Sequence, residues 1–220
     1  MTVIEFNFND DWMGEIGRRL GDLNDKTPDV ISQATNSTAR KARKLIVQSL
    51  REHYAEDAKT KEYNAAMKIA RPSRKKYDAT IYIRGKVQNL RRFNVSPKDP
   101  PASGSSRPPT TRAQVLLQGG LKELNKGGIK AFITTFKNGD VVVAQRNGSF
   151  YTYHRPTGGI DRHHEAIDKL WSISIPKMAE SQLDPKTVRG NMRDTIQAIL
   201  VEEIEKQIAR QLAKHGGNAG

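Results

Sequence analysis

The sequence contains no cysteine, which excludes disulfide bonds, thiolate nucleophiles, cysteine-ligated zinc and iron–sulfur clusters. It also lacks any run that approaches the ~20 consecutive apolar residues of a membrane-spanning helix. The opening MTVIEFNFNDD is acidic where a secretory signal is basic. Only 36% of the 220 residues are hydrophobic and 6% are aromatic, so two large independent cores are not expected. From this composition we expect a soluble chain with no membrane segment. Packing and assembly must stabilise its folded state.

The sequence also lacks the local motifs of common catalytic sites, among them the P-loop, G-x-G-x-x-G, H-E-x-x-H and G-x-S-x-G. One polar group has the residue types that ligate metals: His154, Asp161, His163, His164 and Glu165. The adjacent His163 and His164 would point to opposite faces of a strand, so we interpret the run as a polar surface loop. We therefore expect a protein without enzymatic activity, metal or cofactor, and keep a metal-dependent enzyme centred on these histidines as an alternative.

Positive charge is what the chain has in excess: 37 Lys and Arg stand against 24 Asp and Glu, for a formal net charge of +13. The segment from Arg40 to Arg112 holds 19 basic and 6 acidic residues and accounts for the whole excess, whereas the first 29 residues are acidic. Such a segment attracts nucleic acid or an acidic protein surface, although it also fits solvated helix and loop surfaces. The candidate contacts to DNA or to an acidic partner are Arg40, Lys41, Arg43, Lys44, Arg71, Arg74, Lys75, Lys76, Arg91 and Arg92.

Three aromatic residues, Phe150, Tyr151 and Tyr153, lie near Arg146 and Arg155. Aromatic rings beside guanidinium groups form stacking platforms for single-stranded nucleic acid. The same pattern fits a half-buried strand with Phe150 on one face and the two tyrosines on the other. We favour the strand, because the run is short and directly follows a predicted hairpin turn.

The clearest signal in the N-terminal half is a helix from Thr27 to about His53. Thr27 supplies a capping hydroxyl, Pro28 suits the first helical position and Asp29 places an acid in the first turn. The buried positions expected along this helix, several of them small residues, are Val30 or Ile31, Ala34, Thr38, Ala42, Leu45, Ile46 and Leu50.

Weaker patterns flank this helix. A short strand at residues 2–8 and an amphipathic helix from Asp10 to Leu23 are predicted before it. After it we expect a helix over residues 57–70 and two strands that turn at Gly85. The segment 94–112 is rich in Pro, Ser and Gly and predicts a long loop or disordered arm.

Two Asn-Gly pairs, Asn138–Gly139 and Asn147–Gly148, predict tight hairpin turns, because these residues readily adopt left-handed backbone conformations. The flanking sequences IKAFITTF, DVVVAQR and SFYTYHR therefore predict three antiparallel strands in a meander. The sequence AIDKLWSISI predicts a further strand before Pro176.

A long helix is expected from Asp184–Pro185 to His215–Gly216–Gly217. Its apolar residues recur every four positions, so the stripe drifts around the helix by about 40° per step and no single neighbour can cover it. We expect part of the stripe at an intersubunit surface, with packing on the helix's own sheet as the alternative. The candidate intersubunit residues are Val188, Met192, Ile196, Leu200, Ile204, Ile208 and Leu212.

Together these elements predict an α+β fold, in which long N-terminal and C-terminal helices pack on an antiparallel sheet and a Pro/Ser-rich arm extends from it. Residues 1–26 are expected to form an N-terminal extension with a short helix. Residues 27–214 would form a single α+β domain with a flexible arm at 94–112, and residues 215–220 a loose tail.

Four segments occur in a characteristic order: ATNSTARKARKLIVQSLREHY, ATIYIRGKVQNLRRF, IKAFITTFKNGDVVVAQR and LWSISIPKMAES, the last leading into a long terminal helix. This order resembles a known family, the minor tail protein Z family of tail completion proteins in long-tailed double-stranded DNA bacteriophages. Together with that helix, the four segments extend over most of the chain after residue 27, and the similarity lies in their order. The arm around Pro97 to Pro109 departs from the pattern in its length and proline content.

The resemblance implies a structural virion protein that is assembled in the host cytoplasm, completes the head-proximal end of the tail and helps to join head and tail. It implies other tail and neck proteins as partners, namely the tail terminator, the tail tube and the connector, with genomic DNA as a neighbour in the channel. A homo-oligomeric ring closed by heterologous contacts would follow from the tail's symmetry, and six copies would match the tail tube. The charge fits a different function as well: a free nucleic-acid-binding protein that uses the basic segment 40–112.

Overall fold

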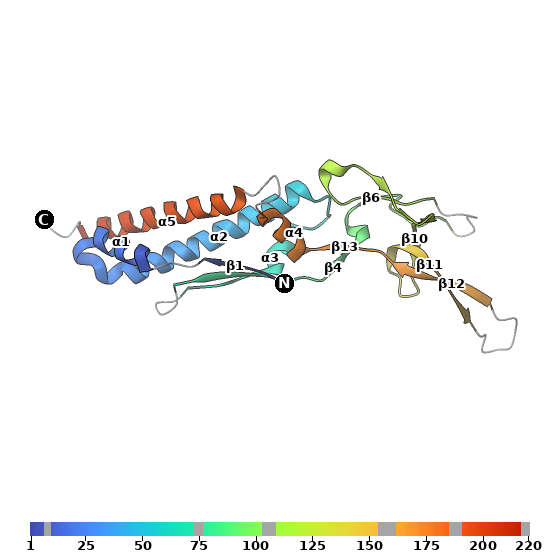
Figure 1. Ribbon diagram of the computed structural model, residues 1–220, viewed down its shortest axis with the longest axis horizontal. Coiled ribbons are helices and arrows are strands. Elements are labelled where there is room, and N and C mark those ends of the chain that lie inside the picture. Colours follow the sequence, from blue (N-terminus) through green and yellow to red (C-terminus); the bar gives the residue numbers. More distant parts are fainter. Residues whose placement is uncertain (7–9, 73–76, 103–108, 154–161, 185–190, 217–220) are drawn as a thin grey trace. The chain divides into compact units, whose positions relative to one another are not determined.

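The structure, a computed structural model, describes residues 1–6, 10–72, 77–102, 109–153, 162–184 and 191–216 (Figure 1). Helices and antiparallel sheets are both present, so the expected α+β class is confirmed. The chain divides into two compact units: unit 1 comprises Met1–Leu50, Lys59–Lys86 and Ile175–Gly220, and unit 2 comprises Arg51–Ala58 and Val87–Ser174. Residues 1–26 are therefore part of unit 1 and not a separate extension, and the expected domain 27–214 contributes to both units. The expected tail lies outside the described residues from 217 onward.

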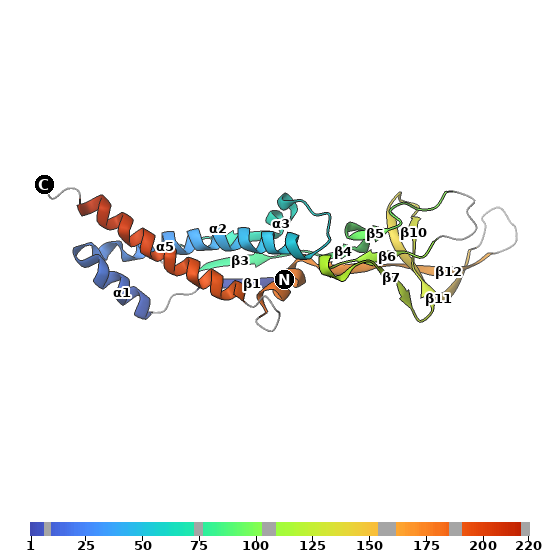
Figure 2. The same cartoon turned by 90° about the horizontal axis from the view of Figure 1, so that it is seen from above.

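Unit 1 combines helices with a three-stranded sheet. Figure 1 shows α2 between α5 and the strand β1, and Figure 2 shows α1 beside α5. The helices are α1 (Asp10–Leu20), the 3-10 helix η1 (Gly21–Lys26), α2 (Thr27–His53), α3 (Thr60–Ala66), α4 (Ile175–Leu183) and α5 (Asn191–Gly216). The strands are β1 (Thr2–Phe6), β2 (Met67–Ala70) and β3 (Ala79–Ile83), which form an antiparallel sheet in the order β1-β3-β2.

Helix α2 has the predicted bounds but begins differently. Thr27 is itself helical, with φ −49° and ψ −47°, because η1 runs directly into α2. Its hydroxyl donates a hydrogen bond of 3.1 Å to the side-chain oxygen of Asn24. The predicted capping role of Thr27 is therefore wrong, although Pro28 lies in the first turn as expected. The predicted buried positions of α2 are confirmed except for Leu45, which is half-buried.

Helix α5 confirms the long terminal helix, although its predicted start and Val188 lie outside the described residues. Five residues of its apolar stripe are buried within the single chain, and Leu212 is 41% exposed. Leu200, Ile204 and Ile208 pack against α1 and α2, so this part of the stripe is covered within its own unit and not by another subunit. It packs on helices, whereas the expected alternative was packing on the sheet. The core cluster consists of Ile16, Leu20, Val30, Ile31, Ala34, Leu200, Ile204 and Ile208, and the buried stripe residues outside it are Met192 and Ile196.

Strand β2 replaces the end of the helix predicted over residues 57–70, which is wrong beyond Ala66. Met67 pairs with Ile83 and Ile69 with Ile81, so β2 forms one edge of the sheet. The pairing satisfies the backbone groups and buries Met67, whereas an isolated helix of this length is unstable. Tertiary pairing therefore outweighs the helix propensity of this short segment.

An ion pair joins α2 to α5. The Nζ of Lys41 lies 2.7 Å from a carboxylate oxygen of Glu203, whose side chain is only 1% exposed, and 3.5 Å from Glu202. Burial disfavours the charged form of Glu203, but hydrogen bonds from Lys41 and Ser37 outweigh it, so the pKa of Glu203 lies below its ordinary value. The hydrogen bond to Glu203 likewise raises the pKa of Lys41. The folded state thus favours the charged form of both partners.

Acid should weaken unit 1 partly through Glu203. A carboxyl whose pKa is lower in the folded state adds stability above its unfolded pKa of about 4.3, and that stability is lost as the pH falls through the folded pKa. We expect the free energy of unfolding, measured by urea denaturation between about pH 5 and pH 2, to fall less steeply in Glu203→Gln than in the wild type. Asp22→Asn, at an exposed position on η1, is the control. Parallel curves for Glu203→Gln and wild type would contradict this linkage.

Unit 2 consists mainly of short antiparallel strands, with a core that includes Ile133, Val142 and Val143. The sheets have the orders β10-β11-β12, β5-β6-β7, β13-β4 and β8-β9. The elements are β4 (Val87–Asn89), η2 (Leu90–Arg92), β5 (Asn94–Ser96), β6 (Arg112–Gln114), η3 (Leu117–Gly119), β7 (Lys122–Glu123), β8 (Asn125–Lys126), β9 (Ile129–Lys130), β10 (Phe132–Thr135), β11 (Val141–Tyr153), β12 (Arg162–Lys169) and β13 (Trp171–Ser174).

Two expected features around unit 2 differ from the structure. The chain forms no hairpin at Gly85, since β3 pairs with β1 and β2 while β4 pairs with β13. A Cβ on Gly85 would lie 3.3 Å from Pro176, so the glycine serves a close approach of two segments. The arm predicted at 94–112 is not a free loop at its ends, because β5 pairs with β6. Its middle, residues 103–108, lies outside the described residues.

The predicted meander is present with different strands. The turn at Asn138–Gly139 is confirmed: Gly139 has φ 84° and its N–H donates a 2.9 Å hydrogen bond to the carbonyl of Phe136, between β10 and β11. At Asn147–Gly148, however, the predicted hairpin turn is wrong, because β11 continues through both residues to Tyr153. The third strand of the meander is β12, which follows β11 in the sheet.

Candidate interaction surfaces

Exposed apolar side chains are concentrated in unit 2. Among the described residues, twelve large hydrophobic side chains are exposed, and eight of them belong to unit 2 although unit 1 is larger. Apolar side chains that lie together in water, unlike ones scattered singly, mark surfaces that associate with other proteins. The eight residues are Val87, Leu116, Leu117, Leu121, Phe150, Tyr151, Ile167 and Trp171.

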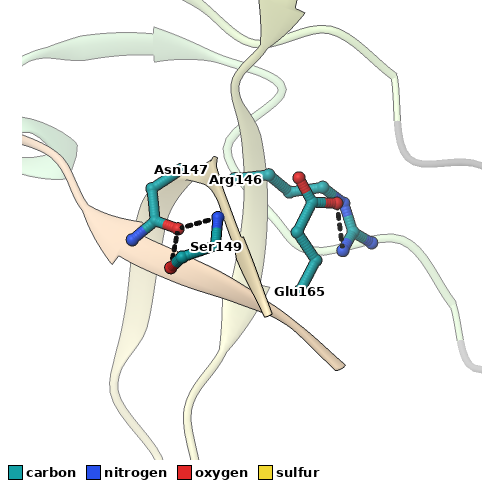
Figure 3. A network of polar contacts seen from close by, with 4 residues as sticks. All are labelled: Arg146, Asn147, Ser149 and Glu165. Atoms are coloured by element: carbon teal, nitrogen blue, oxygen red, sulfur yellow. Dashed lines mark hydrogen bonds and ion pairs between the residues drawn. The ribbon is translucent and has the colours of Figure 1, made fainter. Parts of the chain in front are cut away.

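A bulge in β11 positions the two exposed aromatic residues of the β11–β12 hairpin. Arg146 pairs with Ile167 and Phe150 with Glu165, so β11 has additional residues between these two pairs. The side-chain oxygen of Asn147 accepts hydrogen bonds from the N–H and the hydroxyl of Ser149, at 2.9 and 2.6 Å (Figure 3). Between them Gly148 has φ 80°. The Asn-Gly pair therefore supplies the left-handed residue of a β-bulge and does not form the predicted hairpin turn.

Beyond the bulge the hairpin carries aromatic rings on both faces. Directly paired residues share a face, so Phe150 lies with Glu165, and Tyr151 lies with His164 on the other face. The ring of Tyr151 stacks on His164 with a centroid distance of 5.7 Å and an interplanar angle of 28°. The predicted alternation of Phe150 and Tyr151 is confirmed, but these residues are 69% and 55% exposed and not half-buried.

Arg146 is held against its own sheet on the face of Phe150. Its guanidinium carbon lies 5.8 Å from the centre of the Phe132 ring, and one of its nitrogens lies 3.3 Å from the carboxylate of Glu165 (Figure 3). Glu165 thus offsets the charge of Arg146. A stacking platform for single-stranded nucleic acid combines its aromatic rings with uncompensated positive charge, so the geometry here suits a protein surface better. Arg155 and the side chain of Tyr153 lie outside the described residues.

The histidine run belongs to a strand, which corrects the predicted surface loop. His163 and His164 lie in β12 and point to opposite faces, as the adjacent positions predicted. The Nδ1 of His163 lies 3.1 Å from the hydroxyl of Thr152, whereas His164 stacks on Tyr151. No group of three His, Cys, Asp or Glu side chains that could hold a metal occurs in the described ranges, to which His154 and Asp161 do not belong.

The four candidate cations on α2 differ in their surroundings. Arg40 and Lys44 lie one turn apart and are exposed. Lys41 is paired with Glu203, and Arg43 is half-buried. Of these four residues, Arg40 and Lys44 therefore present their charges most openly to an anionic partner.

The candidates in η2 are paired with carboxylates. The Nε of Arg92 lies 3.2 Å from Glu56, whose side chain has no exposed surface, so Arg92 compensates a buried charge. Arg91 lies 3.7 Å from the exposed Asp99. These pairs reduce the charge that η2 offers to DNA. The other predicted contacts are Arg71, which is exposed, and Arg74, Lys75 and Lys76, which lie outside the described residues.

A cleft beside Arg91 was not anticipated from the sequence. It has a volume of about 690 Å³ and combines positive with negative side chains, so it selects no single class of ligand. Bridges from Tyr54 to Leu116 and from Glu56 to Phe93 create it by joining distant parts of the chain, for which no local pattern exists. Its charged residues are Arg51, Glu56, Asp57, Arg91 and Lys98.

Within the described ranges, every helix is too short or too polar to cross a membrane. The chain matches no protein-family profile, no curated protein and no solved structure. The exposed surfaces of its two units are therefore the basis for assigning a function.

Proposed function

We propose that this chain is a structural protein of a bacteriophage tail, which completes the head-proximal end of the tail and helps to join head and tail. The observation that carries the proposal is the concentration of exposed apolar side chains in unit 2, above all on the β11–β12 hairpin. Covering such side chains with a partner is favourable by about 25 cal/mol per Å² of apolar surface. The four segments that resemble the minor tail protein Z family support a tail as the assembly.

In this proposal unit 2 provides the contacts to neighbouring proteins, which are the tail terminator, the tail tube and the connector. Further copies of the chain are partners as well, in a ring of six that matches the tail tube. The exposed Arg40 and Lys44 of unit 1 suit the genomic DNA in the channel or an acidic partner.

Electron cryomicroscopy of purified phage particles tests the proposal. We expect density for this chain at the junction of tail tube and head connector, with the β11–β12 hairpin covered by another protein. Particles produced without the chain should accumulate as separate heads and tails. If the chain is absent from mature particles, or if its hairpin projects into solvent there, the proposal is wrong.

A second function, free binding of nucleic acid, is favoured by the exposure of Arg40 and Lys44 one turn apart on α2. Arg40→Glu/Lys44→Glu can be compared with Arg210→Glu/Lys214→Glu, which makes the same charge change at exposed positions with the same spacing on α5. We expect both variants to change DNA affinity by the same factor, as an effect of net charge alone, in titrations at several salt concentrations. A selective loss in the α2 variant, with a salt slope smaller by about two, would establish the second function.

A further inference from the structure

A cleft in unit 1 runs along the edge of strand β1. It has a volume of about 520 Å³, and it is lined by residues of β1, the end of α4 and the first turns of α5. Four consecutive residues of β1, Thr2 to Glu5, line it. Because successive side chains of a strand point to opposite faces, four in a row border one cleft only along the edge of the strand. The cleft therefore presents the backbone of β1 together with side chains.

β1 is an edge strand. It pairs with β3 on one side, and no other described strand pairs with it. The hydroxyl of Thr2 donates a 3.0 Å hydrogen bond to the carbonyl of Pro176, which fixes one end of β1 beside α4. An edge held in place offers N–H and C=O groups at the spacing of an extended peptide, which can add to the sheet as a further strand.

The floor of the cleft is apolar. It is formed by Leu183 of α4 and by Ile196 and Leu200 of α5, whose side chains are all buried in the fold. Val3 of β1, at the side of the cleft, is 43% exposed. An added strand places alternate side chains on one face, so every second residue of the peptide would meet these apolar groups.

The rim of the cleft carries mostly negative charge. Three carboxylates, from Glu5, Glu180 and Asp184, line it together with one guanidinium, that of Arg193. Lys177, which does not line the cleft, lies 3.2 Å from Glu180 and offsets part of this charge, so the net charge of the rim is weakly negative. The Nε of Arg193 donates a 2.9 Å hydrogen bond to the carbonyl of Leu183, which holds this cation at the floor side of the cleft. Complementarity of charge therefore selects a peptide with basic side chains and disfavours an acidic one.

We propose that this cleft binds an extended segment of a partner protein, in which apolar residues alternate with lysine or arginine, as a fourth strand beside β1. The partner is a different protein from this chain. The proposal concerns unit 1 alone and does not depend on a role of the chain in a phage tail.

The test uses the full chain and a short acetylated and amidated peptide of alternating lysine and valine. Calorimetric titration should show binding of this peptide and none of its counterpart with glutamate in place of lysine. Glu5→Lys/Glu180→Lys should weaken binding by about tenfold or more, because the charge of the rim reverses. Asp22→Lys, at an exposed position of η1 away from the cleft, should stay within about twofold of the wild type.

Hydrogen exchange gives an independent readout. Alternate backbone amides among Val3, Ile4 and Glu5 should exchange more slowly when the lysine peptide is bound, because a new strand accepts hydrogen bonds from them. Unchanged exchange at these amides, or equal weakening by the rim and control variants, would overturn the proposal. Self-association of the chain that the rim variant abolishes would overturn it too, since a second copy would then occupy the edge.

Discussion

Replacing Ile204 with alanine should lower the free energy of unfolding by about 2–5 kcal/mol, one of the two largest effects expected in this protein. Ile204 is 1% exposed and packs in the cluster where α5 meets α1 and α2. The substitution removes buried methyl and methylene groups and leaves a cavity among side chains that belong to three helices, which can close around it only partly. Urea denaturation followed by circular dichroism measures the change.

Val201 on the same helix provides the matched control. It is 39% exposed, so Val201→Ala should change the free energy of unfolding by no more than about 0.5 kcal/mol. The loss caused by Ile204→Ala should also be independent of protein concentration, because the cluster lies within one chain. If the loss of stability instead grew on dilution, Ile204 would lie at an intersubunit surface. The sequence pattern of α5 alone was compatible with that location.

The elements that were predicted correctly are those whose signals are local. Helix α2 follows from a proline and an acid in its first turn and from apolar positions at helical spacing, and its end at His53 agrees with the prediction. The turn at Asn138–Gly139 follows from a pair that tolerates left-handed conformations. Helix α4 was missed, because Pro176 suggested the end of a strand, whereas proline also suits the first turn of a helix.

The errors occur where distant partners decide the structure. Met67–Ala70 is a strand because β3 lies beside it, and the Asn147–Gly148 pair becomes a bulge because β12 pairs with β11 on both sides of it. For the candidate interaction surface, too, the sequence identified residues but not their surroundings. The residues of the β11 aromatic run were named from the sequence, but their exposure depends on which faces the rest of unit 2 covers. Likewise, Lys41 and Arg92 were predicted to contact DNA or an acidic partner. In the structure, carboxylates from other segments of the chain lie beside them.

The aromatic pair of the hairpin should carry much of the contact to a partner protein. Aromatic anchors that become fully covered cost about 2 kcal/mol or more when truncated, which is a factor of about thirty in affinity. Phe150 and Tyr151 are on opposite faces of the hairpin, so a partner that covers both must enclose the strand and not merely touch one side. If the chain acts in a tail as proposed, such enclosure would make the joining of head and tail sensitive to both rings.

In the proposed tail role, Phe150→Ser/Tyr151→Ser should therefore weaken the contact to the partner by about thirtyfold or more. The yield of joined phage particles, counted by electron microscopy when the variant alone supplies the chain, should fall as a result. Because both rings are exposed in the free chain, its free energy of unfolding should change by less than about 1 kcal/mol, so the loss would not come from misfolding. Thr135→Ser, at an exposed position of β10 in the same sheet, is the control and should leave assembly at the wild-type level.

Wild-type yields from the double variant would show that the hairpin is not the surface through which the chain acts in a tail. A loss of assembly with unchanged stability would place the contact on this hairpin, because the two substitutions alter little else than the apolar surface that a partner covers.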